Sequence, residues 1–550
     1  MSDAEDLIPR RPDARRFVAM VVITAATAIA LGHALRQPTQ MGANDISRWC
    51  AVWSLLERHS YIIDECPWQI DTQDKVFRTS KWTGGKDGPK HYYSSKPLLL
   101  STVIAGILYP ARIATGVPLD RIILQERAER WTQKPDPEHP GQIKAVLEKP
   151  EQPVKWPAYV FYLKPIVILL NVIPYGVFLI LFARVLDRYT VNDWSWFFCL
   201  VAAAFGTDLL PFTQTLNNHT VAAWSAFFAL YLFLRIWDEW ELSGWRFAAA
   251  GFWAAFAAAN ELPALAFLAL IVLLLVIRYP WKTALFFLPA AAIPVAGFLA
   301  AQYAAFGQIE LAYQSFGTED YLYDGSLWKT PLELDALLEH PESYGVYLFH
   351  ITLGHHGIVS LSPIFLFSIW GTLRLLGGGG RFLTVWTWLT LLAIAGLSGY
   401  YLYDPSAWKA GGALHPYLWV FWFIPGLLAL LAVLSALLVL RRGGAPMAAV
   451  AWMTSVLTVV VLAFYTWRPE ARNYGGSTQG LRWLFWLIPF WLLMLFKGVE
   501  AGQTRGLVRR LAVLALALSA LSVGYAMRNP WSHPWILDAL EHLKLYPLTR

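Results

Sequence analysis

The sequence predicts an all-α polytopic membrane protein, a bundle of about 13 transmembrane helices with external juxtamembrane helices. Hydrophobic residues make up 56% of the 550 residues and charged residues only 15%, which leaves too little charge to cover a soluble chain of this length. Apolar runs of about 20 residues, the length that crosses a bilayer, recur along the chain. The 28 tryptophans and 24 tyrosines favour the membrane–water interface, where an apolar ring lies beside a wet polar group.

Residues 17–35 form the first expected transmembrane helix. Four arginines between positions 10 and 16 precede it, and this charge places residues 1–16 in the cytoplasm. A cleaved signal peptide is the alternative, but many spans follow and no clear small-residue cleavage site ends the run. We therefore expect a retained signal anchor.

Twelve further spans are expected within residues 158–527, which form the transmembrane bundle. They lie near 158–183, 194–211, 219–237, 245–261, 263–278, 282–303, 356–376, 382–402, 417–440, 447–467, 480–497 and 510–527.

Loop charge sets the orientation of these spans, because Lys and Arg concentrate in cytoplasmic loops. Arg184 and Arg188 occupy one such loop, whereas the short loops near 212–218 and 261–263 contain no Lys or Arg. The bias holds along the chain only if the apolar stretch 97–114 does not cross the membrane. We therefore expect residues 97–114 to form an interfacial or re-entrant helix.

This topology places residues 36–157 outside as one long segment, with interfacial helices and a Pro/Glu/Lys-rich insertion. The loop 304–355 and the C-terminal tail 528–550 are external as well. The net charge of +6 is explained by basic loops between spans, and no zinc-finger spacing or basic aromatic stripe suggests a nucleic-acid partner. The expected location is the plasma (inner) membrane, with membrane lipids as neighbours.

The chain has three cysteines. Cys199 lies in an apolar run and is expected in the core. Cys50 and Cys66 belong to the same external segment, where a disulfide and two free thiols both remain possible from sequence. No cysteine spacing suits a metal site.

Residues 42–57 have the pattern of an amphipathic helix in the membrane interface. Trp49, Trp53 and Leu56 recur at helical spacing, and Asp45 stands at the start. Asp45 either caps the helix or is a carboxylate able to take a proton from an acceptor hydroxyl.

Lys96 directly precedes a proline and the apolar stretch that follows it. The residue before proline adopts an extended or turn conformation. A lysine there can contact a lipid phosphate or simply anchor the chain among headgroups.

These motifs are similar to the GT-C superfamily of membrane glycosyltransferases. More narrowly, they resemble the branch that contains dolichyl-phosphate-mannose–protein mannosyltransferases and lipid A aminoarabinose transferases. In that branch an Asp-Glu pair begins the first juxtamembrane helix, an aromatic residue follows one turn later, and a Lys-Pro motif opens a second helix. Here Asn44-Asp45-Ile46 keeps the first acid and Trp49 the aromatic position, while the second acid is absent. The resemblance is strongest over residues 1–110.

The resemblance implies a GT-C-like bundle and transfer of a sugar from a polyprenyl-phosphate donor to a lipid, glycan or protein acceptor. Carried over, Asp45 is the general base and Lys96 a phosphate contact. A lipid or solute transporter or flippase is the alternative, although no paired halves with matching broken helices are seen. A lipid-linked oligosaccharide polymerase or ligase is a third possibility.

Further polar residues stand at the external ends of spans. Asn218 and His219 are costly so near hydrocarbon unless they are bonded, so they either cap the next helix or contact substrate. Glu261 lies in a tight turn, either as an acceptor for sugar hydroxyls or as a wet turn residue.

Adjacent histidines, His355 and His356, precede another span. Two adjacent residues on a helix do not face one metal, so we expect contact with phosphate or sugar. Glu319 and Asp320 lie in the same external loop. A divalent cation remains possible, with Asp45, Glu319 and Asp320 as ligands.

The segment 468–483 supplies the remaining candidate substrate contacts, Arg472, Tyr474 and Arg482. The forked guanidinium groups of the two arginines can clamp a phosphate. The predicted topology gathers the main candidates on the external side, namely Asp45, Lys96, His219, Glu261, His355 and Arg482.

Overall fold

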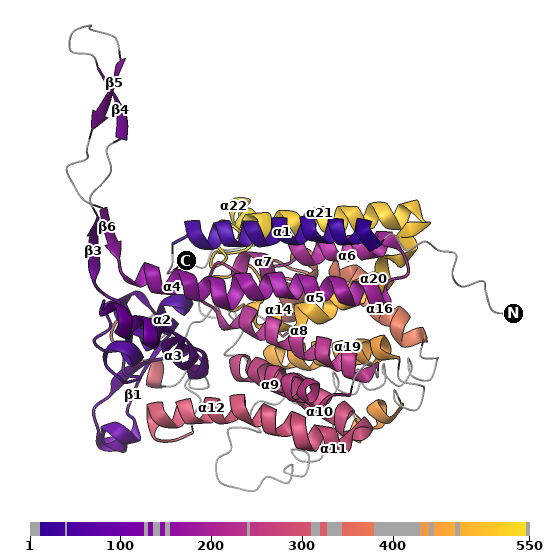
Figure 1. Cartoon of the computed structure of the whole chain (residues 1–550), viewed down its shortest axis with the longest axis horizontal. Coiled ribbons are helices and arrows are strands. Elements are labelled where there is room, and N and C mark those ends of the chain that lie inside the picture. The colour runs from indigo at the N-terminus through magenta and orange to yellow at the C-terminus, as the bar shows by residue number, and fades with distance from the viewer. Residues whose placement is uncertain are drawn as a thin grey trace, which may run out of the picture.

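The computed structural model describes residues 12–38, 41–125, 130–135, 143–148, 154–238, 242–309, 319–326, 344–378, 430–431, 433–438, 445–467 and 474–545. It is 74% helical and 4% strand, so the expected helical class is confirmed. Long helices run side by side along the long axis of the molecule, while α2, α3 and the short strands gather at one end (Figure 1).

The N-terminal part contains α1 (Pro12–Arg36), α2 (Ala43–Glu57), η1 (Gln69–Asp71), β1 (Lys75–Arg78), η2 (Lys81–Thr83), η3 (Gly85–Asp87), β2 (His91–Ser94), α3 (Leu98–Thr115), β3 (Ile122–Gln125), β4 (Arg130–Pro135), β5 (Ile143–Glu148) and β6 (Val154–Pro157). The central part contains α4 (Tyr159–Val167), η4 (Ile168–Val172), α5 (Ile173–Tyr189), α6 (Asp193–Phe205), α7 (Leu209–Phe212), α8 (Asn218–Trp237), α9 (Gly244–Asn260), η5 (Leu262–Ala264), α10 (Leu265–Arg278), α11 (Pro280–Lys282), η6 (Thr283–Phe287) and α12 (Leu288–Phe306). The C-terminal part contains η8 (Glu319–Tyr321), α14 (Tyr344–Thr352), α15 (Ile358–Leu361), α16 (Phe365–Gly378), α19 (Pro446–Trp467), η11 (Arg482–Leu487), α20 (Ile488–Val499), η12 (Glu500–Gln503), α21 (Gly506–Ala526) and α22 (Trp535–His542).

Eight helices among the described residues are long and apolar enough to cross a membrane, which supports an integral membrane protein. They are Ala14–Arg36, Leu98–Thr115, Tyr159–Tyr189, Asn218–Trp237, Pro280–Phe306, Pro446–Thr466, Arg482–Gln503 and Gly506–Ala526. Three shorter apolar helices accompany them. The expected total of about 13 spans is not confirmed, and the expected spans at 382–402 and, for the most part, 417–440 lie outside the described residues.

Burial separates central from peripheral helices. In α8, 83% of the apolar window is buried inside the protein, whereas in α1 only 17% is. The outward side chains of α1 are large and apolar, as at Phe17 and Met20, which suits contact with lipid. α8 packs against α9, α5 and α20, so it is a central helix of the bundle.

The helix α3 corresponds to the apolar stretch 97–114, which the sequence predicts to lie in the membrane interface. α3 packs against α2 and α12 and lies with α2 at one end of the bundle (Figure 1). Its length and composition would also suit a span, so its interfacial placement stays a prediction.

The Pro/Glu/Lys-rich insertion contains strands that its composition did not predict. β3 pairs with β6 and β4 pairs with β5, both antiparallel, and the two pairs extend away from the bundle (Figure 1). The strands are four to six residues long, too short to give a clear alternating pattern between charged and proline-rich neighbours. A separate pair, β1 with β2, lies beside α2.

Candidate functional site

The first turn of α2 buries Asp45 completely. The helix begins after Gly42, which has no side chain, and no side-chain bond caps it, so Asp45 is not the helix cap. Its Oδ2 instead accepts a hydrogen bond from Trp531 Nε1 at 3.0 Å, while Oδ1 has no hydrogen-bond partner. Burial raises the pKa of Asp45 to about 7, against the opposing effect of Arg48.

One turn further along α2, Arg48 is also buried, with 1% of its surface exposed. Its guanidinium donates to the backbone carbonyl of Asn44 at 3.1 Å, to the Asn44 side-chain oxygen and to Asn218 Oδ1. Burial lowers the pKa of Arg48 to about 10, so this side chain is charged at neutral pH. The bond to Asn218 joins α2 to the start of α8.

The start of α8 carries a second set of bonded groups. Asn218 Nδ2 donates to Glu261 Oε1 and to the Asn260 carbonyl, both at 2.7 Å, and His219 Nδ1 is hydrogen-bonded to the same Glu261 oxygen. His219 Nε2 is buried without a partner. Glu261 is 6% exposed, so the expectation of a wet turn residue is wrong.

The loop before α8 is hydrogen-bonded to a π turn in a neighbouring helix. Asn217 caps α8 by accepting from the Thr220 backbone amide at 2.8 Å, so capping belongs to Asn217 and leaves Asn218 and His219 for other contacts. Asn171, in the π-helical turn η4, donates to the Thr215 carbonyl at 2.7 Å and accepts from the Thr220 hydroxyl at 2.6 Å. Such π turns occur often at functional sites.

Lys96 points into this region and forms an ion pair with Asp74, with Nζ 2.8 Å from Oδ2. The Lys96 side chain is 15% exposed, and burial lowers its pKa to about 8. Although burial opposes ionisation, Lys96 and Arg482 hold the pKa of Asp74 below its ordinary value. Lys96 is therefore a bonded group of the site rather than an outward headgroup anchor.

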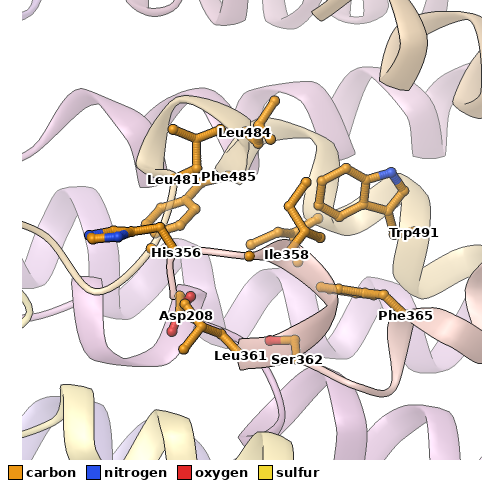
Figure 2. A pocket seen from close by; sticks show the side chains of 13 residues that line it. Asp208, His356, Ile358, Leu361, Ser362, Phe365, Leu481, Leu484, Phe485 and Trp491 are labelled. Carbon is orange, nitrogen blue, oxygen red and sulfur yellow. The ribbon is translucent and has the colours of Figure 1, made fainter. Parts of the chain in front are cut away.

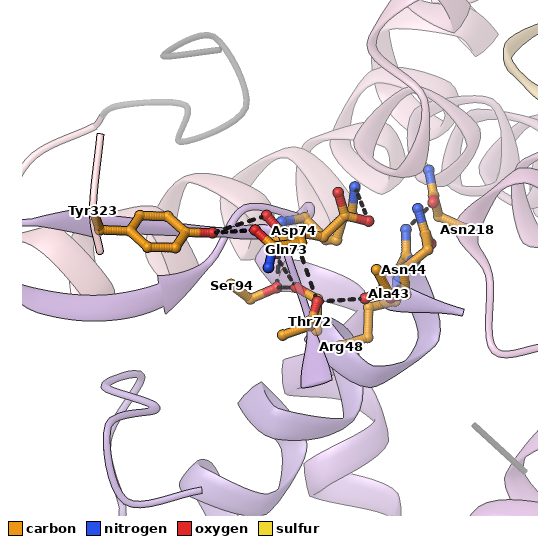
Figure 3. A network of polar contacts seen from close by, with 11 residues as sticks. Ala43, Asn44, Arg48, Thr72, Gln73, Asp74, Ser94, Asn218 and Tyr323 are labelled. Atoms are coloured by element: carbon orange, nitrogen blue, oxygen red, sulfur yellow. Dashed lines mark hydrogen bonds and ion pairs between the residues drawn. The ribbon is translucent and has the colours of Figure 1, made fainter. Parts of the chain in front are cut away.

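A network of hydrogen bonds fixes Asp74 against α2 (Figure 3). Ser47 Oγ donates to the Asp74 carbonyl at 2.5 Å and contacts Ser94 Oγ at 2.7 Å. Thr72 Oγ1 donates to the Ala43 carbonyl at 2.7 Å. The helix of Asp45, the segment of Asp74 and the end of β2 are thus tied together.

Arg482 comes from the far end of the chain, at the start of η11. Its guanidinium lies 5.0 Å from the centre of the Trp531 ring, its Nε has no hydrogen-bond partner, and the side chain is partly exposed. The carboxylates that act on it electrostatically are Asp74, Glu261 and Asp45. Arg482 therefore joins the same group of charges.

We call this group the polar cluster. Its members are Asp45, Arg48, Asp74, Lys96, Asn218, His219, Glu261 and Arg482.

The charges of the polar cluster favour an anion. Three cations face three carboxylates, but burial raises the pKa of Asp45 to about 7 and that of Glu261 to about 8. At neutral pH these two carboxyl groups therefore carry less than two negative charges between them, and the cluster is positive overall. A phosphate group has the charge and the acceptor oxygens to complete it.

The histidines form a second cluster. His355 Nδ1 lies 2.5 Å from His356 Nδ1, and His356 stacks on the Tyr474 ring with centroids 4.9 Å apart. His350 stacks on His355 at 4.0 Å. Burial lowers the pKa of His355 to about 3, so its ring is neutral and suits hydrogen bonding rather than charge pairing.

His356 also lines a small pocket, together with Asp208 and Gly480. His356 and Asp208 occupy one end, and the opposite end is apolar, with Phe365 and Trp491 (Figure 2). Burial raises the pKa of Asp208 to about 7. Sequence reasoning did not single out Asp208.

The remaining predicted residues lie apart from the polar cluster or outside the description. Arg472 lies outside the described residues. Asp320 Oδ2 is 3.5 Å from an Arg78 nitrogen, and Glu319 is exposed. Within the described ranges, no group of three or more His, Cys, Asp or Glu side chains is arranged to hold a metal ion, so Asp45, Glu319 and Asp320 form no such group.

Sequence reasoning missed three members or neighbours of the site. Arg48 belongs to no motif that the sequence analysis singled out. Asp74 lies in a loop without a recognisable motif. Trp531 belongs to a segment expected to be an external tail, yet it is only 7% exposed. Two tryptophans, Trp531 and Trp535, lie close together after the last span. Such large apolar side chains are a sequence signal that this segment packs against the protein.

No known protein family matches the sequence, and no curated protein matches it either. The similarity to the GT-C superfamily therefore depends on the motifs around Asp45 and Lys96. Function has to be argued from the polar cluster itself.

Proposed function

We propose that this protein is a membrane glycosyltransferase of the GT-C type. It moves a sugar from a polyprenyl-phosphate donor to a lipid, glycan or protein acceptor at the external face of the plasma (inner) membrane. The observation that carries the proposal is the polar cluster, in which a carboxyl group with a pKa near neutrality lies among three cations at one end of a membrane bundle.

The cations account for the donor phosphate. Arg482 and Lys96 are the partly exposed members, and they can reach a phosphate at the membrane surface. Arg48 lies deeper and adds positive potential. As the bond to the sugar breaks, negative charge grows on the phosphate, so these contacts strengthen toward the transition state.

Asp45 accounts for activation of the acceptor. Its unpartnered Oδ1 can take the proton of an acceptor hydroxyl, whose oxygen then attacks the anomeric carbon opposite the phosphate. The carbon–oxygen bond to the phosphate breaks, the polyprenyl phosphate leaves with the electron pair, and the anomeric configuration inverts. A pKa near 7 matches this role at neutral pH. Because Asp45 is shielded by Trp531, the acceptor reaches it only when the segment of Trp531 moves.

The neighbouring groups can place the sugar. The free Nε2 of His219 and the carboxyl group of Glu261 lie in the same bonded set. Both suit hydrogen bonds to sugar hydroxyls. In this proposal the polar cluster binds the donor and activates the acceptor. The histidine cluster takes no part in the chemical step.

The test supplies radiolabelled polyprenyl-phosphate hexoses and pentoses to membrane vesicles that contain the wild type or Asp45→Asn. We expect transfer by Asp45→Asn to fall by roughly 100-fold or more, the range for loss of a general base. Glu57→Gln is the matched control, because Glu57 ends the same helix but is bonded to Arg112 at 2.7 and 2.8 Å.

Equal transfer by the wild type and Asp45→Asn would remove Asp45 as the base. Movement of the labelled lipid across the bilayer without any transfer would instead identify a transporter or flippase that uses the same cations to bind phosphate.

A further inference from the structure

Two of the three cysteines meet in the core beneath α2. Cys50 is fully buried on α2, and Cys66 is 4% exposed in the segment between α2 and η1. The Cys50 thiol is hydrogen-bonded to the Cys66 thiol. Both belong to the same packed core.

Backbone hydrogen bonds fix the position of Cys66. Cys66 N donates to the Ile63 carbonyl at 3.0 Å, and Gln69 N donates to the Cys66 carbonyl at 3.0 Å. Ile63 N in turn donates to the Tyr92 carbonyl on β2 at 2.9 Å. Cys66 therefore sits in a turn that is fixed at both ends, while Cys50 is fixed by its helix.

A buried lysine completes the group. Lys75 Nζ donates to the Gln69 carbonyl at 2.7 Å, and its positive charge acts on Cys50. Burial raises the pKa of the Cys50 thiol well above its ordinary value, and the charge of Lys75 opposes that rise. The thiolate is the form that attacks a disulfide in thiol–disulfide exchange.

We propose that Cys50 and Cys66 are joined by a disulfide bond in the mature protein. Both thiols lose their protons, one sulfur–sulfur bond forms, and the two electrons pass to an oxidant of the disulfide class, which takes up two protons to become a dithiol. The reaction takes place as the chain folds outside the cytoplasm, before the core closes over the thiols. It depends on the external placement of residues 36–157 and not on transfer chemistry, so it can fail while glycosyl transfer stands.

The bond would tie together the two halves of the polar cluster that come from the first external segment. Cys50 lies on the helix of Asp45 and Arg48, and Cys66 lies in the segment that leads to Asp74. A covalent link between them fixes the distance from the base to the ion pair of Asp74 with Lys96.

The experiment counts free thiols in the full-length protein. Cells are treated with a membrane-permeant alkylating reagent before lysis, and the purified protein is then denatured in iodoacetamide without reductant. Intact mass spectrometry gives the number of alkyl groups. The chain has three cysteines, so we expect one alkyl group, on Cys199, and three when dithiothreitol is added first. Three groups without reductant would overturn the proposal.

Two variants assign the bond to these residues. Cys50→Ser should show two alkyl groups without reductant, because Cys66 loses its partner, and Cys199→Ser should show none. A Cys50→Ser protein with no alkyl group would place the bond between Cys66 and Cys199, and a Cys199→Ser protein with two would place it between Cys50 and Cys199; either result would overturn the assignment. The count is made on denatured protein, so it remains valid if a variant folds poorly.

Discussion

At the scale of single residues, burial raises the pKa of the proposed base Asp45, and the hydrogen bond from Trp531 is one of the contacts that oppose this rise. The bond reaches Oδ2 at 3.0 Å and favours the ionised carboxylate, while burial raises the pKa of Asp45 to about 7. A general base must be deprotonated to act. The rate of transfer should therefore rise with pH through about 7 and fall again above about 8, where Lys96 loses the charge that binds phosphate.

Trp531→Phe tests this link because it keeps an aromatic ring and removes the indole N–H. Without that donor the pKa of Asp45 rises further, so the ascending limb of the kcat/KM profile should move to higher pH. Trp535→Phe is the matched control, since its indole donates to Ser522 at 2.9 Å and not to Asp45. An unchanged profile in Trp531→Phe would show that Asp45 does not control the rate.

Single residues were predicted unevenly from sequence. Asp45, Lys96 and Glu261 stood out because charged groups at the ends of apolar runs are costly and need a reason. Arg48 did not, because its burial depends on Asn218, which lies 170 positions away. A local sequence pattern cannot show a partner that lies so far away in the chain.

At the scale of elements, the π turn η4 connects the bundle to the polar cluster. Asn171 is fully buried there and holds the loop that leads to Asn218 and His219. Hydropathy predicted one long helix over this region, and the structure has one, but the π turn inside it left no signal in the apolar pattern. The short strands β3 to β6 were missed for a related reason, since a few residues are too few to show a period.

Asn171→Leu should lower both stability and transfer. It removes the hydrogen bonds that Asn171 makes with the Thr215 carbonyl and the Thr220 hydroxyl, at a cost of about 1 kcal/mol each. Asn192→Ala is the control, because Asn192 caps α6 through Ser195 N at 2.8 Å and its loss also costs about 1 kcal/mol. Thermal unfolding should be lowered in both variants, but kcat/KM of the folded protein only in Asn171→Leu. Full kcat/KM in Asn171→Leu would show that η4 does not position the site.

At the scale of the whole molecule, the proposed function requires one orientation of the bundle in the membrane. The helix α2, which carries Asp45 and Arg48, and the short strands lie at one end of the bundle, whereas loops such as the one after α20 lie at the other (Figure 1). Hydropathy identified the long apolar helices, and loop charge predicted which end faces outward. The number of spans was not settled by sequence, because short and broken helices such as α6 and α10 fall below the length of a full span.

Labelling of added cysteines tests this orientation. The natural cysteines are buried, so they should not react in the folded protein. Lys86→Cys and Arg505→Cys introduce thiols at exposed positions of the first external segment and of a predicted cytoplasmic loop. A membrane-impermeant maleimide should label Lys86→Cys in intact cells and Arg505→Cys only after lysis. Labelling of both from outside, or the reverse order, would contradict the topology.

The most direct test of the proposed function is a cryo-electron microscopy structure of the full chain with a polyprenyl-phosphate sugar bound. The account predicts phosphate oxygens within about 3 Å of the side-chain nitrogens of Arg482 and Lys96, with the anomeric carbon turned toward Asp45. A phosphate bound at the histidine cluster, or a sugar turned away from Asp45, would contradict it.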